Sequence, residues 1–155
     1  VPDIVKDTGD KTSMAASFIL YAYLFGKSYA QETDINEIEF TLPAHVAIKR
    51  YILEKTQAGE RPRFTDLYEI LPEEYGEERD RIARMETDGR RDGAKKFDEA
   101  AYFDDCVRTL KIYELERKAE MLTSRFKAET DEDVRRSVAE ELNTVMKQKN
   151  LITRR

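Results

Sequence analysis

Residues 100–126 read AAYFDDCVRTLKIYELERKAEMLTSRF, and they constrain the fold of this chain more than any other stretch. The segment contains no Gly and no Pro and consists mostly of good helix formers, so it predicts one unbroken helix. Its apolar residues recur at helical spacing in two sets, which are Phe103, Val107 and Leu110, and then Ile112, Leu115, Ala119, Leu122 and Phe126. At about 100° per residue, the second set lies roughly 100–180° away from the first. A helix with two such faces has to be buried in two places.

The last helix of the chain supplies a partner for the second face. Residues 131–149 predict a helix, with Thr130 spaced as its N-cap and with one apolar stripe that includes Leu142. A short turn at residues 128–131 would fold this helix antiparallel onto the preceding one and make an αα-hairpin. We expect the seam of the hairpin to consist of Leu115, Ala119, Leu122, Phe126, Val134, Val138 and Val145.

The first face of the long helix then has to pack against the helices that precede it. We therefore expect Phe103, Val107 and Leu110 to belong to the core of a helical bundle. We expect the helices of this bundle at residues 13–30, 43–58, 65–71 and 73–85. The ranges follow from the spacing of apolar residues, from Pro residues at helix starts and from a Gly at a helix end. A charged loop is expected at residues 87–96, before the long helix at residues 97–128.

No segment alternates apolar and polar residues convincingly, so the predicted fold class is all-α. We expect a helical bundle that a long shared helix joins to a C-terminal antiparallel helical hairpin. The expected division is a linker or disordered segment at residues 1–11, the bundle subdomain at residues 12–111 and the hairpin subdomain at residues 112–155. The chain begins with Val and shows no signal-peptide pattern, which indicates a fragment of a longer protein.

Residues with catalytic or metal-binding chemistry are sparse in this sequence. His45 is the only histidine, and the position three residues before it is Leu, so the Glu-x-x-His pattern of di-iron bundles is absent. We expect His45 to pack or cap in the first turn after Pro43, and the single cysteine, Cys106, to be a small buried hydrophobe. Phosphate-binding glycine loops and Cys/His metal spacings are also missing. We therefore expect no catalytic residue, no metal and no cofactor in this chain.

Charge and hydropathy favour a protein partner over nucleic acid or membrane. The sequence carries 27 Lys and Arg against 32 Asp and Glu, a net charge of −5, so it has no overall attraction for nucleic acid or an anionic membrane. The longest apolar run, residues 14–25, falls short of the roughly 20 residues that a membrane span needs. A lone cysteine forms no intramolecular disulfide, which fits a reducing compartment.

Apolar residues of the last helix that lie off the seam are candidates for contact with that partner. Met146 lies beside the seam and Leu151 lies well round the helix. Scattered surface apolar residues are also common in proteins without such a role. We assign partner binding to Ala139, Leu142, Asn143, Met146, Leu151 and Ile152.

Two stretches of the sequence resemble a known family. Residues 42–71, LPAHVAIKRYILEKTQAGERPRFTDLYEIL, and residues 99–122, EAAYFDDCVRTLKIYELERKAEML, are similar to the C-terminal helicase-binding domain of bacterial DnaG-type DNA primases. The most specific part of the resemblance is YFDDCVRTL, followed by LERKAEML and an acidic turn. The resemblance covers residues 12–150.

The resemblance implies a helix bundle, a long helix and a C-terminal hairpin, with no catalysis by this fragment. It implies that the chain docks a primase onto the N-terminal domains of the hexameric replicative helicase, in the cytoplasm, during primer synthesis for DNA replication. The hairpin would grip the helicase and the bundle would modulate its activity. The parent's zinc-binding and polymerase domains would precede residue 1. The N-terminal domain of the helicase itself and an unrelated all-α adaptor remain alternatives, and an enzyme is a third class.

Overall fold

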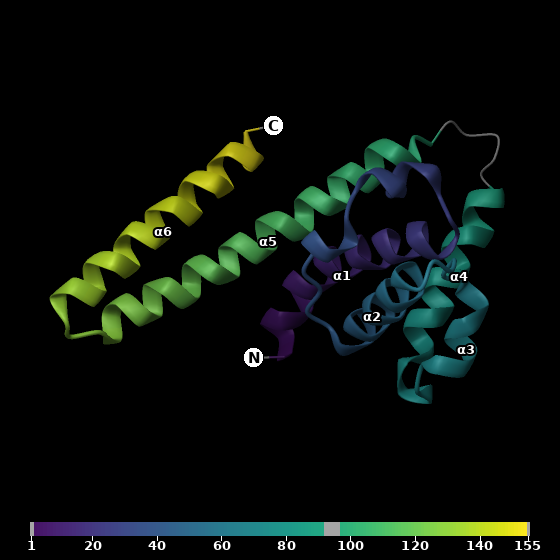
Figure 1. Ribbon diagram of the computed structural model, residues 1–155, viewed down its shortest axis with the longest axis horizontal. Helices are drawn as coiled ribbons and strands as arrows, with labels where there is room; N and C mark the ends of the chain where they lie inside the picture. The colour runs from purple at the N-terminus through teal and green to yellow at the C-terminus, as the bar shows by residue number, and fades with distance from the viewer. Residues whose placement is uncertain (1, 92–96, 155) are drawn as a thin grey trace. The chain divides into compact units, whose positions relative to one another are not determined.

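The computed structural model describes residues 2–91 and 97–154, which form helices and connecting turns without any strand (Figure 1). The α-helices are α1 (Pro2–Leu24), α2 (Pro43–Gln57), α3 (Leu67–Ile70), α4 (Gly76–Arg91), α5 (Glu99–Ala128) and α6 (Glu132–Thr153). Short 3-10 helices lie between them, namely η1 (Ser28–Glu32), η2 (Ile35–Glu37), η3 (Phe64–Asp66) and η4 (Glu73–Tyr75). The predicted all-α class is confirmed.

Helix α1 differs from the sequence prediction at both of its ends. Residues 2–11, expected to be a linker, belong to the helix, because Pro2 stands at the first helical position, where a missing N–H is tolerated. Gly9 costs only about 1 kcal/mol relative to Ala within a helix of this length. The helix ends at Leu24 instead of near residue 30, because Gly26 adopts φ +63°, a left-handed conformation that stops helices.

The predicted loop at residues 87–96 is also shorter than expected. Residues 87–91 continue α4, while residues 92–96 lie outside the described residues. Residues 87–91 other than Gly89 have side chains that a helix accepts, and one Gly does not end a helix by itself.

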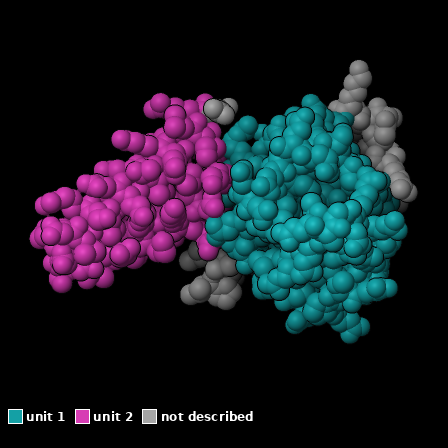
Figure 2. Space-filling view, in the orientation of Figure 1, with its two compact units in different colours: residues 1–110 teal, residues 111–155 magenta. Residues whose placement is uncertain are grey.

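The chain divides into two compact units, residues 1–110 and residues 111–155, shown in teal and magenta in Figure 2. Each unit has its own apolar cluster, and α5 passes through the division as one continuous helix. The first part of α5 therefore contributes to unit 1 and its second part to unit 2.

The core of unit 1 is built around α1, which contacts both α2 and α4. Residues 15–24 of α1 are all buried, as expected of a helix that is apolar on every side. Helix α2 presents Ile48 and Ile52 to this core, and α5 adds Phe103, Cys106 and Leu110. Val107, the third residue predicted for this core, is partly buried and packs against it.

Unit 2 is an antiparallel pair formed by the second part of α5 and by α6 (Figure 1). Leu115, Leu122, Val138 and Val145 are buried between the helices, and Ala119, Phe126 and Val134 pack against them, so all seven residues predicted for the seam lie in this cluster. Asp131, rather than Thr130, caps α6, since its carboxylate accepts hydrogen bonds from the N–H groups of Asp133 and Val134.

Leu110→Ala is expected to destabilise unit 1 by about 2–5 kcal/mol, because it removes a side chain that is 5% exposed and leaves a cavity. Urea unfolding followed by circular dichroism would measure the loss. Met121→Ala, at a side chain that is 60% exposed in the same helix, is the control and should change stability by less than about 0.5 kcal/mol. Equal effects of the two substitutions would contradict the burial of this face.

Candidate functional site

The outer surface of α6 is fixed by the way this helix packs on α5. Val138 and Val145, seven residues apart, face α5 and are buried. Leu142 and Ile152 also pack against this seam cluster. Both residues, which we expected to bind a partner, are partly buried, because they continue the buried stripe of the hairpin.

Three of the other residues assigned to partner binding share one face of α6. Ala139, Asn143 and Met146 follow one another at spacings of four and three, which places them on one side of the helix next to the seam. Ala139 is half-buried, Asn143 is exposed and Met146 is 40% exposed. We call Ala139, Asn143 and Met146 the Met146 face.

Leu151 lies on a different side of α6 from the Met146 face. Five residues separate it from Met146, which corresponds to a rotation of about 140° around the helix. Its side chain is 64% exposed. The six residues that the sequence analysis grouped together therefore divide among the seam, the Met146 face and an isolated exposed leucine.

Two cationic side chains of α6 contact α5 near the two ends of the seam. Near the turn, the guanidinium carbon of Arg135 lies 4.3 Å from the centre of the Phe126 ring. Toward the other end, Lys149 Nζ lies 3.0 Å from Glu116 Oε2 and so links α6 to α5. Sequence reasoning missed both contacts, although Arg135 and Lys149 occupy positions that continue the 3–4 spacing of the seam.

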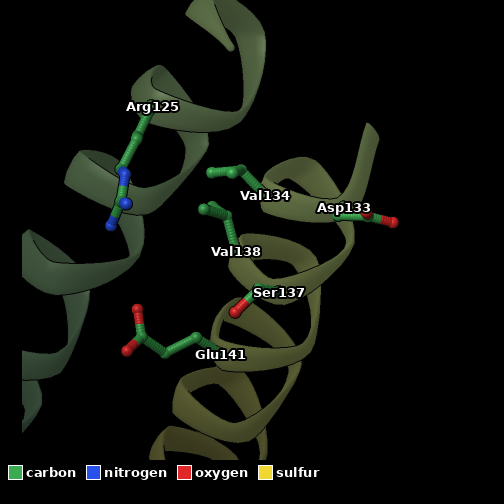
Figure 3. A pocket seen from close by; sticks show the side chains of 6 residues that line it. All are labelled: Arg125, Asp133, Val134, Ser137, Val138 and Glu141. Carbon is green, nitrogen blue, oxygen red and sulfur yellow. The ribbon is translucent and has the colours of Figure 1, made fainter. Parts of the chain in front are cut away.

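A groove of about 340 Å³ lies on the hairpin near its turn (Figure 3). Val134 and Val138 provide its apolar surface, Arg125 projects into it from α5, and Glu141 projects into it from α6. Ser137 and Asp133 complete the lining, and the Asp133 carboxylate points away from α5. Of these residues, only the two valines belong to an apolar stripe that is visible in the sequence, and the polar residues beside them carry no such signal.

Unit 1 contains a buried polar cluster that sequence reasoning did not find. Ser17 from α1, His45 from α2 and Glu78 from α4 are 0%, 1% and 9% exposed. His45 Nε2 lies 2.9 Å from Glu78 Oε1, and the Ser17 hydroxyl donates to Glu78 Oε2 at 2.6 Å. His45 is thus buried, as expected, but it pairs with a carboxylate from a distant helix.

The arrangement of this cluster differs from that of a catalytic triad. In a triad the serine donates to one histidine nitrogen while the acid binds the other. Here the Ser17 hydroxyl lies 3.4 Å from His45 Nε2 and donates to Glu78, and the same Nε2 atom contacts the Glu78 carboxylate. Arg81 adds a charge near Glu78, at 3.7 Å, and donates to Ser13 Oγ at 3.0 Å. Such a cluster satisfies buried polar groups and joins three helices.

Cys106 is a buried thiol of low reactivity. It is 3% exposed, and burial raises the pKa of its thiol to about 11. A thiolate, the nucleophilic form, is therefore rare at neutral pH. This agrees with its interpretation as a small core hydrophobe.

Comparison with protein-family models, with curated proteins and with solved structures finds no match for this chain. Among the side chains that the structure describes, those of residues 11–88 and 97–154, no group of three or more His, Cys, Asp or Glu is placed to hold a metal ion. None of the helices in the described part of the chain has the length and apolar character to cross a membrane.

Glu78→Ala is expected to lower the free energy of unfolding by about 1–3 kcal/mol, because it leaves His45 and Ser17 buried without their shared hydrogen-bond partner. Glu77→Ala, at the exposed neighbouring position, removes the same charge and should cost less than about 0.5 kcal/mol. Chemical denaturation of the two variants at neutral pH measures the difference. A loss below 1 kcal/mol for Glu78→Ala would show that the cluster contributes little.

Cys106 is expected to resist a thiol reagent in the folded protein at pH 8. With a pKa of about 11, roughly a thousandth of the thiol is ionised at that pH, and burial also blocks access. The reaction is followed by the absorbance of the thionitrobenzoate that the reagent releases. The native protein is compared with the protein unfolded in guanidinium chloride. Reaction of the native protein as fast as the unfolded one would contradict the burial of this residue.

Proposed function

We propose that this chain is a non-catalytic interaction domain of a bacterial DnaG-type primase, and that its hairpin binds the N-terminal domains of the hexameric replicative helicase. The observation that carries the proposal is the hairpin of unit 2, whose seam is buried while the Met146 face stays open to solvent. The sequence resemblance at residues 99–122 supplies the identity of the partner.

The hairpin has the properties of a stable binding element. Its turn is capped by Asp131, and the Phe126–Arg135 contact and the Lys149–Glu116 ion pair secure the seam at its two ends. A partner then meets a helix surface that is already ordered, which lowers the entropic cost of binding. A methionine on such a surface adapts its shape to an apolar pocket.

The proposal gives the two units different roles and assigns no reaction to this chain. The hairpin would supply the grip on the helicase, and unit 1 would modulate helicase and primase activity during primer synthesis. The domain would act in the cytoplasm as part of the replisome, without direct contact with nucleic acid. The exposed apolar side chain of Met146, one turn beyond Asn143 on the same side of α6, supports a protein contact at this face.

Met146→Lys is expected to weaken binding to the helicase N-terminal domains at least about ten-fold, because it places an ammonium group in an apolar contact. Leu151→Lys is the matched control, since it introduces the same charge at an exposed apolar residue about 140° round the same helix. Isothermal titration calorimetry of both variants against the wild-type chain measures the effect. Circular dichroism confirms that each variant keeps its helix content.

The pattern of losses distinguishes the possible contact surfaces. Weaker binding by Met146→Lys alone supports the Met146 face, whereas weaker binding by Leu151→Lys alone would move the contact to another side of α6. Leu142→Asp, which inserts a carboxylate against the seam, should disrupt the hairpin and abolish binding while unit 1 stays helical. Unchanged binding by that variant, or no binding by the wild-type chain, would refute the role of the hairpin.

A further inference from the structure

The groove on the hairpin, shown in Figure 3, receives opposite charges from its two helices. We call it the hairpin groove, and it is lined by Arg125, Asp133, Val134, Ser137, Val138 and Glu141. Arg125 projects into it from α5, and Glu141 projects into it from α6. Both residues are exposed, and among residues 11–88 and 97–154 neither side chain has an ion pair or a hydrogen bond. Both charges are therefore available to a partner.

Apolar side chains lie beside these two charges. Val134 is half-buried and lines the groove between the helices. Met121, which is 60% exposed, precedes Arg125 by four residues in the unbroken helix α5, so the two side chains lie one turn apart on the same side. A partner that covers the groove would thus bury apolar surface in addition to pairing the charges.

We propose that the hairpin groove is a self-association site and that its occupant is the same groove of a second copy of this chain. In a two-fold dimer every contact occurs twice, because the residue pair i and j is repeated as j and i. A two-fold axis that passes midway between Arg125 and Glu141 brings the guanidinium of each copy to the carboxylate of the other. Met121 and Val134 are covered in the same contact.

The charges of the groove select a second copy over other occupants. They reduce to one cation and one anion, since the Asp133 carboxylate points away from α5 and lies 3.9 Å from Arg136 Nη1. Nucleic acid or an anionic membrane would attract Arg125 but repel Glu141, and a purely basic segment would do the reverse. A second copy carries both complementary charges at the required separation, because the two-fold rotation exchanges the positions of Arg125 and Glu141.

The hairpin groove and the Met146 face lie on different sides of α6. Glu141 and Met146 are five residues apart, which corresponds to a rotation of about 140°. Association through the groove therefore leaves the Met146 face of each copy open to another partner. The inference goes beyond helicase binding by the hairpin, and it is tested without helicase, so the failure of either proposal leaves the other standing.

Sedimentation equilibrium of the complete chain, at concentrations from about 10 µM to about 1 mM, measures the self-association. The contact is confined to one side of the hairpin, so we expect a weak dimer with a Kd on the order of 100 µM. Raising NaCl from about 50 mM to about 500 mM should weaken the dimer, because the two ion pairs are screened.

Charge-reversal variants test the contact between the two side chains. Arg125→Glu and Glu141→Arg should each weaken the dimer at least about ten-fold, because each places like charges opposite one another at both symmetry-related positions. Lys127→Glu and Glu140→Arg are the matched controls, since they make the same changes of charge at exposed positions about 160° and about 100° round the same helices. The controls should keep the wild-type Kd within about two-fold. Circular dichroism confirms that all four variants keep their helix content.

Combining the two reversals provides a rescue that a merely destabilising substitution would not show. The double variant Arg125→Glu/Glu141→Arg exchanges the two charges and should dimerise as the wild-type chain does. An equimolar mixture of the two single variants should also associate, because one copy then offers two anions and the other offers two cations.

Four results would overturn the proposal. A chain that stays monomeric at about 1 mM does not self-associate through this groove. Equal losses in the test and control variants would show a general effect of net charge. Failure of both rescues would show that Arg125 and Glu141 do not face each other across the contact. Species larger than a dimer would contradict the two-fold arrangement, since a head-to-tail contact continues from copy to copy.

Discussion

The burial of α5 on two different faces is the constraint on which the rest of this structure depends. Leu110 belongs to the core of unit 1 and Leu115 to the seam of unit 2, and five residues of a regular helix rotate the buried side by about 140° between them. A helix with a single apolar stripe would have served only one of these clusters. Because α5 contributes residues to both clusters, a change in the way one cluster packs on α5 also affects the helix on which the other cluster packs.

The two units differ in their chemistry as well as in their packing. Residues 1–110 contain 16 Lys and Arg against 23 Asp and Glu, whereas residues 111–155 contain eleven against nine. Unit 1 joins three helices through Ser17, His45 and Glu78, while the hairpin relies on apolar seam residues with ion and ring contacts at its ends. Unit 1 therefore carries a net negative charge, whereas the hairpin carries a small net positive charge.

Much of this architecture follows from local patterns in the sequence, and the remainder depends on contacts between distant residues. The spacing of Phe103, Leu110, Leu115 and Leu122 is enough to place them on two buried faces, because helical periodicity is a local property. The pairing of His45 with Glu78 is not visible in this way, since 33 positions separate them and only the packing of α2 against α4 through α1 brings them together. The groove beside Arg125 and Glu141 likewise arises only when two helices are placed side by side. At the N-terminus, Pro2 and Gly9 are residue types that are common in turns, but both lie within one long helix.

The antiparallel hairpin also has a consequence for the order in which the chain folds. Its contacts join α5 to the next helix across the short turn at residues 129–131, so those near the turn, such as Phe126 with Arg135, close small loops. In unit 1, by contrast, Ser17 meets Glu78 across 61 positions, and α5 joins a core that begins at Ala15. Contacts between residues close in sequence form faster than distant ones. During refolding of the whole chain, the seam of the hairpin is therefore positioned to form first, and to present the second part of α5 already helical while the core of unit 1 is still assembling.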